Sequence, residues 1–187
     1  MISGTNSARW RLISNEKPLA VSVVAGILAT HIATIFGYWF HGIGLVNLDF
    51  PRFNAYLLFR AELGEDPAAI FEAASSTSRL LIGWSVHLFT GVVWAILYVA
   101  VVHPLLGRMS NLLRALIWGA VLATISAVWW VPVLFPEFNL GAFSWNLDGF
   151  WGVVAIYVWH GIYAVNLALI YNPLSEDELA ELNLARA

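Results

Sequence analysis

The sequence predicts an all-α integral membrane protein built as a bundle of four transmembrane helices. Of its 187 residues, 60% are hydrophobic and only 11% are charged, and the mean hydropathy is +0.74. Ordinary globular chains carry about 25% charged residues, so this chain has too few charges to keep a folded surface in water. The composition argues against a soluble enzyme, a nucleic-acid-binding protein and a disordered chain.

Four segments are long and apolar enough to cross a bilayer, which takes about 20 residues for a hydrocarbon core of roughly 30 Å. These segments are 19–43, 80–102, 112–135 and 150–171. None of them contains Asp, Glu or Lys, and their one Arg, Arg114, lies near a span end, where we expect it to reach the lipid headgroups. Residues 1–187 are therefore expected to form one membrane domain.

The distribution of Lys and Arg predicts which side of the membrane each connection faces. With the N-terminus inside, six basic residues flank the inner ends of the spans and three flank the outer ends. The inner set is Arg9, Arg11, Lys17, Arg108, Arg114 and Arg186, and the outer set is Arg52, Arg60 and Arg79. Because cytoplasmic segments carry an excess of Lys and Arg, both termini are expected to be cytoplasmic.

The connections differ in length and character. The outer loop 47–78 contains PRFNAYLLFRAE, whose mixture of aromatic and basic residues suggests a helix in the membrane interface. The inner turn HPLLGRMSN is short, so the helices before and after it are expected to pack as an antiparallel pair. In the inner acidic tail 173–187, Ser175 and Glu178 have the spacing of a capping box at the start of a short helix.

Small residues recur at every fourth position in the spans, which is typical of helices that pack closely in lipid. The predicted contact stripes contain Ser22, Gly26, Thr30 and Thr34; Gly83, His87, Gly91 and Ala95; Ala115, Gly119, Ala123 and Ala127; and Gly152, His160, Ala164 and Ala168. Two segments, HLFTGVVWAILY from His87 and HGIYAVNLALIY from His160, share a His and a Tyr eleven residues apart. The shared spacing suggests that the bundle consists of two repeated helical hairpins.

Three segments also carry a pattern seen in a known group: GWSVHLFTGVVWAILY, LIWGAVLATISAVWWVPVL and WHGIYAVNLALIY. The matching positions are His87, Tyr98, Gly119, Pro132 and His160. In residues 80–171 the chain resembles the YagU-like group of uncharacterised bacterial inner-membrane proteins. This resemblance implies a four-span protein of the bacterial inner (cytoplasmic) membrane and brings no activity with it.

Three histidines, His31, His87 and His160, lie well inside predicted spans, where ionisable residues are costly and suggest function. One interpretation is structural: each neutral ring donates a hydrogen bond to a carbonyl of a neighbouring span, or to Tyr98, Thr30 or Asn166. A second is that His87 and His160 bind a cofactor, as axial ligands of haem b or as ligands of a chlorophyll-type pigment. A third is a copper or zinc site formed by His31, His87 and His160.

No pattern of catalytic residues accompanies these histidines. The chain has no cysteine, the spans hold no carboxylate, and no nucleophile elbow or phosphate-binding loop is present. We expect a non-catalytic accessory, assembly or scaffolding subunit of a larger membrane complex. Its expected partners are the lipid bilayer and other membrane-protein subunits, without nucleic acid and without a cofactor. The alternatives are a haem-b electron carrier, a pigment- or metal-binding subunit and, less favoured, a small transporter.

Overall fold

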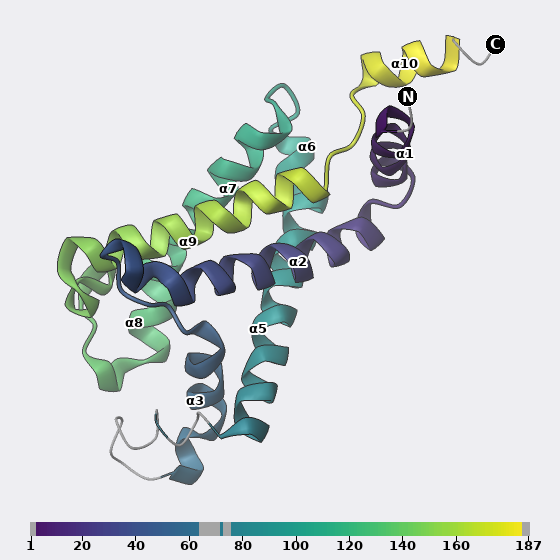
Figure 1. The fold of residues 1–187 in the computed structure, drawn as a ribbon. Helices are drawn as coiled ribbons and strands as arrows, with labels where there is room; N and C mark the ends of the chain where they lie inside the picture. The colour runs from purple at the N-terminus through teal and green to yellow at the C-terminus, as the bar shows by residue number, and fades with distance from the viewer. Residues whose placement is uncertain (1–2, 64–71, 73–75, 185–187) are drawn as a thin grey trace.

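The computed structural model describes residues 3–63, 72 and 76–184, and these residues form helices and connections without a strand (Figure 1). Four helices are long and apolar enough to cross a membrane: Pro18–Ile43, Thr77–Leu105, Asn111–Leu134 and Gly149–Ile170. Their bounds lie within three residues of the predicted ones. The predicted all-helical fold with four long apolar helices is therefore confirmed.

The elements follow one another along the chain with short connections. The first half contains α1 (Ser3–Glu16), α2 (Pro18–Trp39), η1 (Phe40–Ile43), α3 (Phe50–Leu63), α5 (Thr77–Leu97), η2 (Tyr98–Val102) and α6 (His103–Leu105). The second half contains α7 (Asn111–Ile125), η3 (Ser126–Trp130), α8 (Val131–Leu134), η4 (Pro136–Phe138), η5 (Ala142–Leu147), α9 (Gly149–Ile170) and α10 (Glu176–Leu184).

Helix α2 has the central position, packed against α5 on one side and α9 on the other, while α7 packs against α9 and α3 against α5 (Figure 1). Helices α5 and α7 approach each other mainly next to the turn that joins them. The expectation that they pack as an antiparallel pair is therefore met only there. The reason is that their small-residue faces point elsewhere, that of α5 toward α2 and that of α7 toward α9.

The predicted small-residue stripes are confirmed as contact faces, because every residue in them is buried. A Cβ atom at Gly91 would overlap the Thr30 side chain of α2. A Cβ atom at Gly119 would lie 2.7 Å from Cβ of Ala164 and 2.8 Å from the carbonyl oxygen of His160. At these two positions only glycine lets the neighbouring helix come so close.

Two long helices widen into a π-helical segment that ends two residues before a proline. In η2 the N–H of His103 donates to the carbonyl of Tyr98, and in η3 the N–H of Val131 donates to the carbonyl of Ser126. The prolines that follow, Pro104 and Pro132, lack an N–H and would clash with the carbonyl four residues back in a regular helix. The wider turn relieves this clash without ending the helix.

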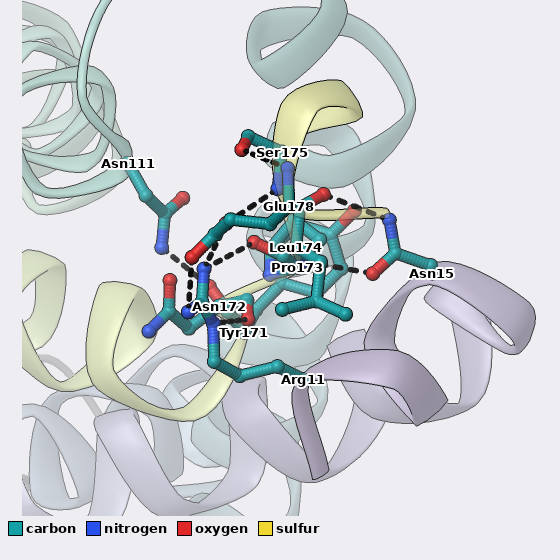
Figure 2. Close-up of polar contacts among 9 residues, drawn as sticks. All are labelled: Arg11, Asn15, Asn111, Tyr171, Asn172, Pro173, Leu174, Ser175 and Glu178. Atoms are coloured by element: carbon teal, nitrogen blue, oxygen red, sulfur yellow. Dashed lines mark hydrogen bonds and ion pairs between the residues drawn. The ribbon is translucent and has the colours of Figure 1, made fainter. Parts of the chain in front are cut away.

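Outside the core of the bundle, α1 is tied to the segment that joins α9 to α10 (Figure 2). The Arg11 guanidinium donates to both carboxylate oxygens of Glu178 at 2.7 Å, and also to the carbonyls of Asn172 and Pro173 at 3.3 Å. The side-chain amide of Asn15 exchanges two hydrogen bonds with the backbone of Leu174.

The same end of α9 receives two further donors. Trp10 Nε1 donates to the carbonyl of Ile170 at 2.7 Å, and Asn111 Nδ2 donates to the carbonyls of Ala168 and Tyr171. The last carbonyls of a helix have no partner within it. Here side chains from α1 and α7 supply those partners, so both termini are fastened to one end of the bundle.

The predicted capping box of α10 is present. Ser175 N–H donates to Glu178 Oε2 at 2.8 Å, and Glu178 N–H donates to Ser175 Oγ at 3.3 Å. Arg114, which was expected to extend toward headgroups, instead folds back onto the preceding turn. Its guanidinium donates to the carbonyls of Met109 and Gly107 and to His103 Nε2, because that turn leaves acceptors within reach.

We predict that Gly119→Ala destabilises the bundle by about 1–3 kcal/mol, since the added methyl group has no space against α9. The measurement is thermal unfolding in mild detergent. Gly161→Ala is the matched control, because a Cβ atom there has no neighbour within 4 Å and alanine favours helix. Equal melting of Gly119→Ala and the parent would contradict the close contact.

A second prediction concerns pH. The hydrogen bonds from the Arg11 side chain and from the Ser175 backbone lower the pKa of the Glu178 carboxyl from 4.5 to about 2. A lowered folded-state pKa stabilises the fold fully above the unfolded value and loses this effect as the pH falls through the folded value. The difference in melting temperature between the parent and Glu178→Gln should therefore be constant above about pH 5 and shrink toward about pH 2. A difference that is the same at both pH values would contradict the contact with Arg11.

Candidate functional site

A cavity lies inside the bundle, where α5 and α7 diverge. It is lined by residues of α2, α3, α5, α7, η3 and α9, and it is not closed on every side. It leaves about 80 Å³ for the centres of water-sized molecules, several times the roughly 10–15 Å³ that one water needs. Both His87 and His160 line it.

Helix α5 places His87 against the polar face of α2. His87 Nε2 lies 2.9 Å from Thr34 Oγ1, and that hydroxyl donates its own proton to the carbonyl of Thr30 at 2.8 Å. Thr34 can therefore only accept from the ring, so the proton of a neutral His87 is on Nε2. Its Nδ1 is then an acceptor, and this atom has no hydrogen-bond partner among the described residues.

In His160, on helix α9, the roles of the two ring nitrogens are reversed. His160 Nδ1 lies 2.8 Å from the carbonyl oxygen of Ile156, one turn earlier in the same helix. A carbonyl only accepts, so Nδ1 carries the proton and Nε2 has the lone pair. Among the described residues, the one partner of Nε2 is the Ser126 hydroxyl of η3 at 3.4 Å, a distance at the long limit for such a bond.

Two aromatic side chains contact both imidazoles. The Phe50 ring stacks on His87 with centroids 5.7 Å apart and meets His160 edge-on at 6.4 Å. The Trp159 ring lies 5.6 Å from His87 and 4.9 Å from His160. Phe50 and Trp159 also touch each other, with centroids 4.9 Å apart, so the two imidazoles and these two rings form one aromatic cluster.

The cavity is polar at its α2 wall as well. Thr30, only 1% exposed, lines the cavity, and its Oγ1 has no hydrogen-bond partner in the described part of the chain. None of the lining residues is acidic or basic apart from the two histidines. A buried imidazolium would have no counter-charge here and would be costly, which agrees with two neutral rings.

The structure brings His87 and His160 to one cavity but not His31. His31 lies on the exposed side of α2, where its ring is 5.2 Å from Trp84. Within residues 3–63, 72 and 76–184, no three His, Asp or Glu side chains gather into a group that could hold a metal ion. The three-histidine set is therefore not assembled. For haem b or a pigment ligated by both imidazoles, Phe50 and Trp159 would have to move apart.

The hydrogen-bond partners of the two rings differ from those expected. Thr34, Ser126 and the carbonyl of Ile156 take the places suggested for Thr30, Tyr98 and Asn166. Tyr98 lies about three turns further along, at the start of η2, where its hydroxyl donates to Asn111 Oδ1 at 3.0 Å. Thr34 could have been found, because it lies one turn after Thr30 on the same stripe. Phe50 carried no local signal, because only the folding of α3 against α5 places it here.

Comparisons of the chain with protein-family models, curated proteins and solved structures find no match. The fold and the site define an all-helical protein with four helices that could cross a membrane and an uncharged, partly polar cavity among them.

Proposed function

We propose that the chain is a multi-pass protein of the bacterial inner membrane with both termini cytoplasmic. The apolar residues that point outward from the long helices support insertion, among them Val24, Ile27, Leu28, Leu81 and Phe89. The bundle end that holds both termini carries Arg9, Arg11, Lys17, Arg108 and Arg114, and the opposite end carries Arg52, Arg60 and Arg79. This bias favours the terminal end as the cytoplasmic one.

Reporter fusions test this topology. Fusions after Asn111 and after Ala187 should have cytoplasmic activity, and a fusion between Glu62 and Glu72 should have periplasmic activity, because the Lys and Arg residues set the orientation. The reverse pattern would overturn the assignment of the two faces.

Two repeated hairpins, α2 with α5 and α7 with α9, remain part of the proposal. In each hairpin a histidine of the second helix faces a hydroxyl of the first long helix, His87 with Thr34 and His160 with Ser126. Each hairpin also has a close glycine contact, although the glycine lies on the second helix in one hairpin (Gly91) and on the first in the other (Gly119). The parallel between the two histidine–hydroxyl pairs supports the duplication suggested by the shared His and Tyr spacing.

We infer that the protein is a non-catalytic accessory protein of the membrane that holds a small uncharged molecule in the bundle cavity. The observation that carries this inference is the pair of buried imidazoles that line the cavity, each fixed by one ring nitrogen and left with an acceptor on the other. Binding sites of small molecules are typically apolar hollows with a few placed polar groups. The absence of charge among the lining residues favours a neutral ligand that can arrive from lipid.

Bromobenzene is a suitable probe, because bromine quenches tryptophan fluorescence and Trp94, Trp130 and Trp159 line the cavity. We expect saturable quenching of the purified protein in mild detergent. Thr90→Phe, which fills the cavity from α5, should weaken the binding by roughly tenfold or more by displacing the ring.

Ser85→Phe is the matched control for this experiment. Ser85 is exposed on the same helix and, like Thr90, its hydroxyl donates only to the carbonyl four residues earlier. Quenching that is unsaturable, or equal in the parent, Thr90→Phe and Ser85→Phe, would contradict ligand binding in the cavity.

The second candidate is a scaffolding subunit of a larger membrane complex, and His31 is the observation that favours it. An exposed ring on α2 would face lipid in an isolated bundle, which is unfavourable for a polar group. A neighbouring subunit could cover it. If the protein is only a scaffold, quenching by bromobenzene should be the same in the parent and in Thr90→Phe.

A further inference from the structure

We propose that the cavity ligand presents hydroxyl groups on a flat ring, as a hydroquinone does, and that these hydroxyls donate to His87 Nδ1 and His160 Nε2. This inference rests on the proposed function, because it specifies the chemical class of the molecule held in the same cavity. It concerns binding alone and includes no chemical step.

The direction of the hydrogen bonds follows from the tautomers of the two rings. The Nε2 proton of His87 is directed to Thr34, and the Nδ1 proton of His160 is directed to Ile156. Both remaining nitrogens are lone-pair acceptors. A ligand that offers only acceptors, such as an ether or an ester, would leave both unpaired, whereas a ligand with O–H donors would pair them.

The two acceptor nitrogens belong to buried side chains, so a ligand that gives them no hydrogen bond is disfavoured. His87 and His160 are each 7% exposed, and Thr30, whose hydroxyl has no partner among the described residues, is 1% exposed. A buried polar atom without a partner is unfavourable. The Ser126 hydroxyl at 3.4 Å supplies only a long bond to His160, so a ligand hydroxyl can replace or join it.

The walls favour a flat ring over a flexible chain. Phe50 and Trp159 contact both imidazoles, and Trp94 of α5 meets Trp130 of η3 edge-on with centroids 6.4 Å apart. Aromatic rings prefer offset-stacked or edge-to-face neighbours. A ring with hydroxyls at its edge can meet these faces while its oxygen atoms reach the nitrogens.

The experiment compares hydroquinone with 1,4-dimethoxybenzene, which has the same ring and oxygen atoms but no O–H donor. Each compound competes with bromobenzene for the parent protein in oxygen-free detergent solution. Single variants His87→Leu and His160→Leu remove one acceptor each, and His87→Gln and His160→Gln retain an amide acceptor. His31→Leu makes the same change outside the cavity.

The quantity compared is the ratio of the displacement strength of hydroquinone to that of 1,4-dimethoxybenzene. We expect this ratio to be roughly tenfold higher in the parent than in either Leu variant. The comparison between variants cancels the different partition of the two compounds into detergent. His31→Leu should keep the full preference, and the Gln variants should restore part of it. Melting temperatures identify any variant that does not fold, and at that position Phe, which keeps a ring but has no acceptor, replaces Leu.

The possible failures are distinct. If bromobenzene itself does not bind to the parent, the proposed function fails. If bromobenzene binds but the relative displacement by the two compounds is the same in the parent and in the folded variants that lack an acceptor at His87 or His160, the cavity binds ligands without hydrogen bonds from their hydroxyls to these rings. That result would overturn this inference and leave the proposed function standing.

Discussion

The close approach of helix backbones at small residues is the constraint on which the rest of the structure depends. In lipid, apolar side chains gain little by leaving one apolar neighbour for another, so direct packing must hold the helices together. The Thr30 side chain lies against Gly91, and this contact sets the register that brings His87 level with Thr34. On the other side, Gly119 lies against the carbonyl of His160, and the same helix brings Ser126 to that ring two turns later.

The cavity is a consequence of how these contact faces are distributed. Because α5 presents its small residues to α2 and α7 presents its own to α9, the two helices joined by the short turn have no small-residue face in common. They separate away from the turn, and large rings occupy part of the space between them: Trp118 donates to the carbonyl of Trp94, and Trp94 meets Trp130. The wider turn of η3 begins at Ser126, so the residue that faces His160 lies at the irregularity that Pro132 causes.

Sequence patterns predicted local features well and long-range ones poorly. Hydropathy locates the long helices, and four-residue spacing locates their contact faces, because both follow from helix geometry alone. The same spacing separates the histidines: His87 and His160 lie on their stripes, whereas His31 is one position past Thr30 and so points about 100° away. The pairing order of the helices, the arrival of Phe50 and the ring tautomers depend on contacts between distant segments. No single helical pattern encodes them.

Hydrogen-bonding groups are paired at the end of α9 but only partly paired in the cavity. At the end of α9, carbonyls that the helix leaves without partners are met by side chains of Trp10 and Asn111, while Arg11 and Asn15 pair with the backbone of the segment that follows. In the cavity, one nitrogen of each imidazole is held as firmly, yet the second nitrogens and the Thr30 hydroxyl are left with a long bond or none among the described residues. A half-satisfied buried network is less stable than a complete one or an apolar core. The sequence completes such a network where only the fold depends on it, and the open polar groups beside the aromatic wall, which include Trp159 Nε1, are those that the ligand we propose would complete.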